Sequence, residues 1–564
     1  MTSAPQAGAE RTADVTVVGA GPVGLSIANF LGLRGISVNV VEALPALIDY
    51  PRGVGIDDES LRSLQTMGLI QDVLPHTTPS HIMRLTNGKG RILVEIAPSA
   101  DEFGWSRRNA FVQPAVDRML HAGLARFDTV DVHFNHSMVA IRETGDVVEV
   151  DTTNEAGEPM RFRSRYLVGA DGGRSLTRKH TGTTFQGQSP STRWLVIDLE
   201  NDPLGTPNVW VGGDPRRPFV SLGLPHALRR FEFMLFENEP DERIEDADFV
   251  AGLLERHVPD PRSLQILRKR VYTHHSRIAG DFRTGSVFLA GDAAHLMPVW
   301  QGQGWNSGMR DATNLSWKLA EVITGKAHDA LLDTYNSERR SHAKAMIDIS
   351  VAFGRFVKPT NVFVAGLRDG AASMLNVVPA VKQYFAQMKY KPMPRYVSGV
   401  VVDPVDGSIG SARAQLGGAL TPYRNFRRTP SPVGTQFIQP LVREVDGADR
   451  LLDDVIGYRW AVLQWGGDPT RHMTEDELEL LRDLDAVAIS LRPLSQVPNQ
   501  EESGACVVLG DTTGRIKRWF DGRPTSCIVL RPDRFVAAGG LAQDTGRLLT
   551  AAAAAAHIRR KERS

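Results

Sequence analysis

The chain has 564 residues, which predicts two to four domains at about 150 residues per domain. Hydrophobic residues make up 42% and charged residues 23%, a composition typical of a globular protein with a sizeable core. The 65 basic residues balance the 65 acidic ones, so we expect no general binding to nucleic acid. Cys506 and Cys527 form neither a CxxC motif nor a metal-binding spacing and are expected to be buried structural thiols.

The location of the protein is predicted from missing signals. Residues 1–12 lack the apolar core of a signal peptide, and no stretch reaches eighteen consecutive apolar residues. We therefore expect a cytoplasmic protein without a membrane partner. A run of alanines at 551–556 predicts a helix near the end of the chain.

The first strong signal is a strand–turn–helix–strand unit. A β-rich run at 14–18 precedes a glycine-rich turn and an amphipathic helix, and a second strand at 37–41 ends at Glu42. Such glycines allow a tight turn and the approach of a pyrophosphate, and the acid can accept ribose hydroxyls. The unit predicts a dinucleotide site without distinguishing FAD from NAD; the alternative is a plain glycine-rich turn. The turn reads Gly19, Ala20, Gly21, Pro22, Val23 and Gly24.

Two further apolar strands end at an aspartate. The run 165–170 leads to Asp171 in the motif at 171–178, and the run 286–290 leads to Asp292 in the motif at 291–298. Ligands in open α/β sheets bind at this edge, although either aspartate could instead cap a helix. The Gly-Gln-Gly-Trp-Asn stretch at 302–306 precedes a predicted helix and is typical of a phosphate or oxyanion nest.

Together these three motifs resemble the class A flavoprotein monooxygenases, the single-component aromatic hydroxylases of the 4-hydroxybenzoate and phenol hydroxylase type. The resemblance covers residues 14 to about 350, and 400–564 resembles the C-terminal domain of the phenol hydroxylase branch. Among family members the whole chain looks most like the 3-(3-hydroxyphenyl)propionate hydroxylases, a resemblance carried by the stretch 291–319. The resemblance implies an α/β fold, with a Rossmann-like FAD-binding domain, an inserted β-sheet substrate domain and a C-terminal thioredoxin-like domain.

The expected domains follow from this resemblance and from the sequence pattern. The FAD-binding domain is expected at 14–80, 105–185 and 278–330, and the substrate sheet at 81–104 and 186–277. A helical segment is expected at 331–390 and a proline-rich linker at 391–410. Alternating strands and helices predict the thioredoxin-like domain at 411–564, which lacks the CxxC motif needed for dithiol chemistry.

The resemblance also implies which residues hold FAD. Glu42 would bind the adenosine ribose, Asp171 would serve FAD and the nicotinamide, and Asp292 would contact the ribityl chain. Arg52 could instead be an exposed loop arginine, and Gln113 a surface residue. The full implied set is Gly19, Ala20, Gly21, Pro22, Val23, Gly24, Glu42, Arg52, Gln113, Asp171, Asp292, Gly302, Gly304 and Asn306.

Pro298 and the backbone of 302–306 would line the flavin ring. Relatives commonly have a second proline after Pro298, and its replacement by Val299 leaves the loop shape open. His295 and Pro298 are the candidate catalytic residues, although His295 could equally be a hydrogen-bonded structural histidine. No base for the phenol and no arginine for a carboxylate stands out. The candidates for the aromatic pocket are Trp300, Trp305, Trp210 and Phe233, with core packing as the alternative for the first two.

The implied reaction consumes NADH or NADPH and O2 and hydroxylates a small phenolic acid beside its hydroxyl group, through a flavin C4a-hydroperoxide. The expected substrates are 3-(3-hydroxyphenyl)propionate and 3-hydroxycinnamate, converted to 2,3-dihydroxy products in aromatic catabolism. Because only one nucleotide fingerprint is present, we expect the nicotinamide to bind transiently. The alternatives are another phenol, a resorcinol, a chlorophenol or a polyketide, or a flavin-binding protein that does not hydroxylate. No metal is expected, and a homodimer is left open.

Overall fold

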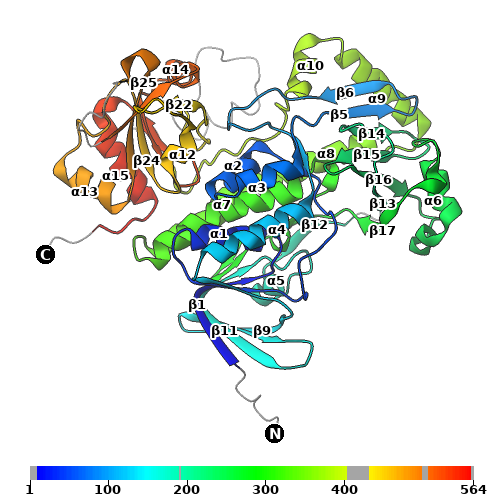
Figure 1. The fold of residues 1–564 in the computed structure, drawn as a ribbon, viewed down its shortest axis with the longest axis horizontal. Coiled ribbons are helices and arrows are strands. Elements are labelled where there is room, and N and C mark those ends of the chain that lie inside the picture. Colours follow the sequence, from blue (N-terminus) through cyan, green and yellow to red (C-terminus); the bar gives the residue numbers. More distant parts are fainter. Residues whose placement is uncertain (1–8, 190–191, 403–430, 498–505, 561–564) are drawn as a thin grey trace, which may run out of the picture. The chain divides into compact units, whose positions relative to one another are not determined.

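The computed structural model describes residues 9–189, 192–402, 431–497 and 506–560 (Figure 1). They form two compact units. The first comprises Met1–Asp101, Trp105–Ala312 and Ala343–Pro392, and the second Glu102–Gly104, Thr313–His342 and Met393–Ser564. Most of the expected FAD-binding and substrate domains falls in the first unit, although 313–330 and 102–104 belong to the second, so the separation of the two domains stays a prediction. Residues 403–410 of the expected linker lie outside the described residues.

The first unit contains a Rossmann-like sheet whose five parallel strands run in the order β20-β11-β1-β2-β8. Helices α1 (Pro22–Gly32) and α4 (Gln113–Gly123) lie side by side along it (Figure 1). The three sequence motifs follow the carboxyl ends of β1, β11 and β20, so the parallel pairing brings them to one edge. The bounds are β1 (Ala9–Val18), β2 (Val38–Val41), β8 (Val130–His133), β11 (Pro159–Gly169) and β20 (Val287–Leu289), with antiparallel additions β9 (Ser137–Thr144), β10 (Val147–Thr153) and β19 (Arg283–Thr284).

A seven-stranded sheet in the same unit has the order β17-β13-β16-β15-β14-β5-β6. Strands from 81–104 join strands from 186–277 through the parallel pairing of β5 with β14. Successive side chains point to opposite faces, and one face packs on helix α6 (Ala247–Leu254). The bounds are β5 (Met83–Asn87), β6 (Ile92–Ile96), β13 (Arg193–Leu199), β14 (Val209–Gly213), β15 (Phe219–Leu224), β16 (Leu228–Leu235) and β17 (Ile266–Thr273).

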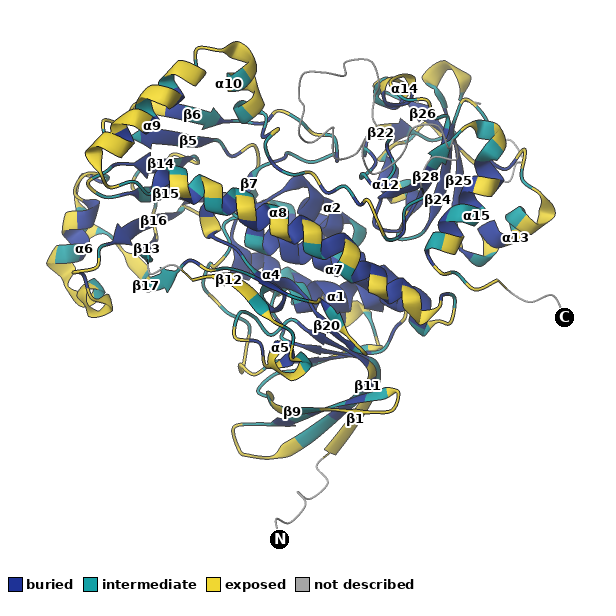
Figure 2. Ribbon diagram, turned by 180° about the vertical axis from the view of Figure 1, so that it is seen from behind, coloured by how far each residue is buried: buried dark blue, intermediate teal, exposed yellow. Residues whose placement is uncertain are grey.

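Short sheets and helices complete this part of the chain. Figure 2 shows broad exposed faces on helices α9 and α10, whereas the neighbouring strands are buried. No helix in the described ranges is long and apolar enough to cross a membrane. The bounds are β3 (Gly55–Ile56), β4 (Thr77–Thr78), β7 (Asn109–Phe111), β12 (Phe185–Gln188), β18 (Ser276–Ala279), β21 (His295–Leu296), α2 (Asp58–Thr66), α3 (Ile70–Val73), α5 (Leu176–Thr181), α7 (Gln303–Ile323), α8 (Asp333–Val357), α9 (Val362–Leu375) and α10 (Pro379–Ala386).

The second unit has its own seven-stranded sheet, in the order β23-β22-β26-β25-β24-β27-β28. The four strands predicted near 460, 486, 506 and 527 form its centre, and helices alternate with them. Cys527 is buried, which raises the pKa of its thiol to about 12, and Cys506 is partly buried. The bounds are β22 (Leu441–Arg443), β23 (Asp449–Leu451), β24 (Ala461–Trp465), β25 (Val487–Pro493), β26 (Val507–Asp511), β27 (Cys527–Leu530), β28 (Val536–Gly540), α12 (Leu452–Ile456), α13 (Glu475–Asp483), α14 (Arg515–Asp521) and α15 (Thr545–Ala555).

Candidate functional site

The turn between β1 and α1 has the form of a phosphate cradle. Gly19 has a φ of +107°, and a Cβ there would lie 2.5 Å from the Ala170 oxygen. A Cβ on Gly24 would lie 2.0 Å from the Gly19 oxygen, so both positions need glycine for packing. A Cβ on Gly21 would meet no atom within 4 Å. The space in front of Gly21, at the uncapped start of α1, therefore fits the pyrophosphate of a dinucleotide.

Glu42 stands at the end of β2 beside this turn. Its carboxylate accepts hydrogen bonds from the backbone N–H of Ala20 at 2.7 Å and of Leu44 at 2.9 Å. A carboxylate has about four acceptor sites, and Glu42 is only partly buried, so it can still accept ribose hydroxyls. Pro22 begins α1, whereas the Val23 side chain packs against Gly291. Val23 thus shapes the turn from within.

The carboxylate of Asp171 accepts hydrogen bonds from residues of its own motif. It accepts hydrogen bonds from the Ser175 hydroxyl at 2.5 Å and from the Thr177 backbone and hydroxyl at 3.0 and 3.1 Å. Arg178 in the same motif donates to the backbone oxygens of Gly173 and Ala293, at 2.8 and 2.7 Å. Asp171 therefore supports the start of α5, whose N-cap is Ser175, and Arg178 ties the second motif to the third.

Two neighbours in the third motif have different surroundings. The side chain of Asp292 is 41% exposed and lies 3.6 Å from Arg52, whose side chain is 56% exposed. His295 is 1% exposed and pairs with the buried Asp311 at 2.7 Å, and Asp311 also accepts from the Gly291 backbone at 3.0 Å. Asp292 and Arg52 are therefore open to a ligand, whereas the geometry of His295 favours a structural histidine.

Asn306 and Gln113 hold backbone segments in place. The Asn306 side chain donates to the oxygens of Gly55 and Gly302 and accepts from the Asp57 backbone, at 3.0, 2.6 and 3.0 Å. Asn306 is 1% exposed, so it positions Gly55 against Gly302, whose φ is +63°. Gln113 likewise accepts from the Gly53 backbone at 2.5 Å. Both side chains thus hold the backbone of the loops expected to contact the flavin. Gly304 lies in the first turn of α7.

The tryptophans predicted to shape an aromatic pocket separate into two groups. Trp300 packs edge-on to Trp194, with ring centroids 4.9 Å apart, within an apolar cluster on one face of the second sheet. Trp305 packs edge-on to Phe111 at 5.1 Å. Trp210 lies between Val209 and Val211, two members of the Trp300 cluster, so its side chain takes the opposite face.

Phe233 also lies on the face opposite Trp300. It packs with Phe231 and the helix α6 side of the sheet. The structure therefore does not bring Trp210 and Phe233 together with Trp300, and the role of each in an aromatic pocket stays a prediction. Both faces of β16 are buried, and the sequence alone does not say which face packs with Trp300.

A row of polar side chains missed in the sequence crosses the face that carries Trp300. Arg230 binds Asp198 through two hydrogen bonds of 2.7 and 3.0 Å and donates to the Pro51 and Arg52 oxygens at 2.5 and 3.1 Å. It therefore fixes the loop that carries Arg52. A sequence signal exists, because β16 contains three charged residues, Arg229, Arg230 and Glu232, within an otherwise apolar strand.

The row continues through Glu232. The Tyr272 hydroxyl donates to Glu232 at 2.8 Å and lies 3.1 Å from His274 Nε2. Burial raises the pKa of Glu232, raises that of Tyr272 well above its usual value and lowers that of His274 to about 3. His274 is therefore neutral at physiological pH and stacks on Trp194.

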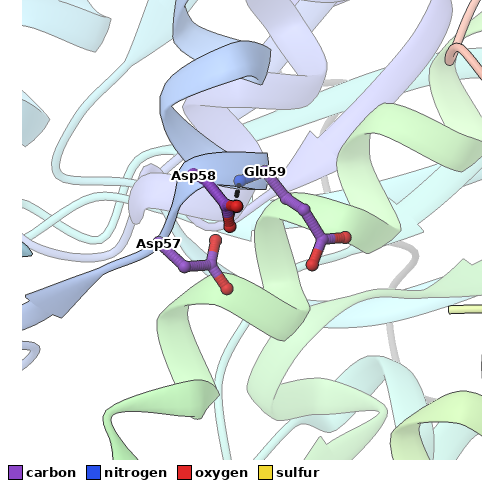
Figure 3. Close-up of side chains that lie close together, drawn as sticks. All are labelled: Asp57, Asp58 and Glu59. Atoms are coloured by element: carbon purple, nitrogen blue, oxygen red, sulfur yellow. Dashed lines mark hydrogen bonds between the residues drawn. The ribbon is translucent and has the colours of Figure 1, made fainter. Parts of the chain in front are cut away.

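Three adjacent acids at the start of α2 have the spacing of a metal site, and Figure 3 shows them together: Asp57, Asp58 and Glu59. Arg310 contacts both Asp57 and Glu59, and Lys391 lies 2.8 Å from Asp57 and 3.4 Å from Glu59. These cations hold the pKa of Asp57 well below its usual range and that of Glu59 near 2. Asp57 and Glu59 are already paired with cations, and burial raises the pKa of Asp58 to about 7, so the cluster fits a buried ion network better than a metal site.

Comparison with known proteins identifies the family. A model described as "FAD binding domain" matches residues 12–350, more than half of the chain. The chain belongs to this FAD-binding family. A second model, "HcaD C-terminal domain", matches residues 434–555. The open turn at Gly21, with Glu42 and Asp292 accessible at the same sheet edge, fits the FAD that the family model implies.

Close relatives of this family member are hydroxylases. It is 49% identical over 546 residues to the "3-(3-hydroxy-phenyl)propionate/3-hydroxycinnamic acid hydroxylase" of Mycobacterium sp. (strain JLS), covering 97% of this chain and 92% of the relative. The protein of the same name from Klebsiella pneumoniae subsp. pneumoniae is 46% identical over 98% of this chain and 96% of the relative. The chain is a flavin-dependent monooxygenase.

Solved structures confirm the predicted fold class. The flavin-dependent monooxygenase PieE is similar with a TM-score of 0.78, at 20% identity over 97% of this chain and 99% of that one. Aklavinone-11 hydroxylase has a TM-score of 0.75, at 22% identity over 96% and 98%. The α/β fold with a Rossmann-like sheet, a second sheet and a separate C-terminal part is therefore shared across this group.

Proposed function

We propose that this monooxygenase hydroxylates 3-(3-hydroxyphenyl)propionate and 3-hydroxycinnamate beside the phenol hydroxyl to give the 2,3-dihydroxy products. NADH is the proposed reductant, with NADPH as the alternative, and O2 is the co-substrate. The observation that carries the proposal is the identity of 46–49%, over nearly the full length, to hydroxylases named for these two acids. A small aromatic acid also suits the aromatic cluster around Trp194 and Trp300.

The residues that would hold FAD lie at one edge of the Rossmann-like sheet. Gly21 would leave room for the pyrophosphate, Glu42 would accept from the ribose, and Arg52 and Asp292 would flank the chain toward the flavin ring. Bound FAD, once reduced, supplies the oxygen-activating chemistry that protein side chains lack. The protein positions the cofactor and orients the substrate.

Water must be kept from the reacting ring, because uncoupled turnover releases hydrogen peroxide instead of product. The buried cluster that includes Trp194, Trp300 and Val112 provides an apolar surface of the kind required. Pro298 is buried just before Trp300, and we propose that it lies beside the flavin ring. Neutral His274, which packs edge-on to Trp300, and the Tyr272 hydroxyl are among the polar groups that adjoin this cluster.

The decisive test measures NADH oxidation in air by the flavin-loaded protein, with and without 3-(3-hydroxyphenyl)propionate, together with catechol formation. Strong stimulation with near-stoichiometric catechol is the expected result. Stimulation with hydrogen peroxide alone would move the substrate to another phenol, resorcinol, chlorophenol or polyketide. No stimulation by any member of a phenol panel would contradict the proposed reaction.

Two variants test the cofactor contacts. Glu42→Ala should weaken FAD retention, and full flavin content in the purified variant would remove the ribose role. Asp292→Ala should lose flavin or coupling of NADH oxidation to hydroxylation. We further propose a cytoplasmic enzyme, where NADH is supplied, and a homodimer, which light scattering after gel filtration would test.

A further inference from the structure

Most arginines of the second sheet that reach its interior have a carboxylate partner. Such pairing is expected, because an uncompensated buried charge is strongly unfavourable. These arginines are therefore already neutralised and offer little to an anionic ligand. The pairs are Arg84 with Glu95, Arg193 with Asp241, Arg217 with Glu239, Arg229 with Asp202 and Arg230 with Asp198.

Arg108 is the exception among the residues around β7. Its one side-chain hydrogen bond runs from Nη2 to the Met83 sulfur at 3.6 Å, and its buried Nε has no partner within the described residues. No described carboxylate forms an ion pair with it. Burial lowers the pKa of Arg108, and Tyr390 is the group that opposes this shift. The guanidinium thus keeps donors that an arriving anion could use.

Two further polar groups near Arg108 also lack partners within the described residues. The Tyr390 hydroxyl and His81 Nε2 are buried without a hydrogen bond. His81 lies beside Arg108 and donates from its backbone to the Arg108 oxygen at 2.9 Å. Burial and the Arg108 charge lower the pKa of His81 to about 3, so the imidazole is neutral. The Arg108 guanidinium and the Tyr390 hydroxyl are donors, so buried polar groups gathered in this way favour a ligand that accepts hydrogen bonds.

These groups border the aromatic cluster of the candidate site. Met83 belongs to the same apolar cluster as Trp300, and Tyr390 packs against that cluster. Arg108 immediately precedes β7, in which Ala110 pairs with Gly55, and Gly55 faces Gly302. Arg108 therefore lies two residues, or about 7 Å of extended strand, from the backbone expected beside the flavin.

We propose that Arg108, assisted by the Tyr390 hydroxyl, binds the carboxylate of the phenolic acid, an inference that rests on the proposed function. The planar guanidinium suits a carboxylate because it can donate two parallel hydrogen bonds. Binding of the carboxylate at Arg108 would hold the aromatic ring of the ligand near Trp300. The same contact would select acids over neutral phenols.

Lys358 is the rival cation. No described carboxylate pairs with it, and its ammonium lies 5.8 Å from the Trp300 ring centre. Burial lowers its pKa, and its charge contributes to the lowered pKa of His274. We favour Arg108 because two other unpartnered polar groups accompany it. The same experiment separates the two sites.

The test is an equilibrium titration of the flavin-loaded oxidised enzyme, followed by flavin absorbance. The ligands are 3-(3-hydroxyphenyl)propionate, its primary amide and 3-propylphenol. Arg108→Met should weaken binding of the acid about 10- to 100-fold, the range of a charge-assisted pair, and change binding of 3-propylphenol less than about threefold. Tyr390→Phe should weaken binding of the acid about threefold to tenfold. Arg84→Met, which removes an arginine paired with Glu95, is the matched control and should leave both ligands unchanged.

The outcomes separate this proposal from the proposed function. If the wild type hydroxylates the acid but Arg108→Met binds it as tightly as wild type, the anchor alone is overturned. A loss of acid binding in Lys358→Met with none in Arg108→Met would move the anchor to Lys358. If the wild type prefers neutral phenols, the substrate and the anchor both fail. If Arg108→Met does not fold, the wild type still decides, because equal affinity for the acid and its amide would exclude a cationic anchor.

Discussion

Two strand–turn–helix units of this chain, β1–α1 and β26–α14, differ in what covers the turn. At β1–α1 a Cβ on Gly21 would meet nothing, and Glu42 reaches the turn from the next strand. At β26–α14 the Arg518 side chain lies 3.2 Å from the Cβ position of Gly514 and donates to the Thr513 oxygen at 3.3 Å. The first turn is open to a ligand, whereas the second is covered by its own side chain.

This difference shows that a parallel sheet with helices does not make a cofactor site by itself. The site arises where glycines leave backbone N–H groups uncovered and a neighbouring strand supplies an acid. In the second unit Asp511 instead accepts from the Lys517 backbone at 2.9 Å and serves the start of its own helix. The comparison can be tested by adding a side chain at the first turn and, as a control, at the second turn.

The largest expected effect comes from Gly24→Ala. Its Cβ would lie 2.0 Å from the Gly19 oxygen, so the phosphate-binding turn must distort. We expect purified protein with little FAD and an affinity at least about 100-fold weaker, measured by flavin fluorescence, because several backbone contacts to the pyrophosphate are lost together. Gly514→Ala in the second unit is the control and should retain full flavin. Normal flavin in Gly24→Ala would contradict the assignment of the turn.

The next effect tests the buried ions of the second unit. Glu338 contacts Arg531 and Lys318, each at 2.8 Å, and these cations lower the pKa of Glu338 to about 2. The ionised Glu338 carboxylate therefore stabilises the folded state above about pH 4.5, and this stabilisation is lost as the pH falls toward 2. We expect Glu338→Gln to lower the free energy of unfolding at pH 7 by about 3–5 kcal/mol, as when one partner of a buried pair is removed.

Urea unfolding at pH 7 and pH 4 measures this effect. The difference between wild type and Glu338→Gln should narrow at the lower pH. Glu479→Gln, on the exposed face of α13, is the matched control and should change stability by less than about 0.5 kcal/mol. Equal stability of Glu338→Gln and wild type at pH 7 would show that the ion pair contributes nothing.

A buried carboxyl group in the first unit should give stability the opposite pH dependence, because its pKa is raised and not lowered. Asp117 is buried and accepts from Gln113 at 3.0 Å, and desolvation raises its pKa to about 7. The folded state therefore binds more protons than the unfolded state, and this contribution is lost as the pH rises from about 4 through 7. Asp117→Asn should stabilise the protein at pH 8 by up to about 4 kcal/mol, from a shift of about three pK units.

Thermal unfolding of Asp117→Asn between pH 5 and pH 8 is the check. The stability of the wild type should fall between pH 5 and pH 8, and the stability of the variant should fall less. Asp128→Asn, an exposed position after the same helix, should keep the decline. A variant less stable than wild type at pH 8 would show that Asp117 is charged and paired in the folded protein.

The smallest effect concerns the thiols. Because burial raises the pKa of Cys527 to about 12, its thiol should resist alkylation in the folded protein at pH 8. Mass spectrometry after iodoacetamide treatment should find Cys527 unmodified until urea is added. Rapid labelling of native Cys527 would contradict a purely structural thiol in the second unit.

The local parts of the fold could be predicted from the sequence, and the long-range parts could not. Strand–turn–helix patterns place Gly19 to Glu42 correctly because each signal lies within a few residues. The contacts that Asn306 makes with Asp57 and Gln113 makes with Gly53 could not be predicted, because those partners lie 249 and 60 residues away in the chain. No local sequence pattern marks Arg108, because what distinguishes it is that no carboxylate among the described residues forms an ion pair with it.

The sheet faces show the same limit. The period-two geometry of β14 and β16 gives two faces, but the sequence does not show that Trp210 and Phe233 lie on the face opposite Trp300. The buried pair of His295 and Asp311 likewise depends on a helix that begins after the motif. Physical chemistry of the sequence identifies the groups, and tertiary packing decides which of them remain open.

The second unit includes Thr313–His342, a stretch that lies inside the residues matched by the FAD-binding model. Lys318 and Glu338 in this stretch are fully buried and depend on Arg531, more than 190 residues later. A chimera that exchanged only residues after 393 between two hydroxylases would therefore mismatch these ions. Domain exchange in such enzymes should take 313–342 along with the C-terminal part, so the useful crossover points lie within helices α7 and α8.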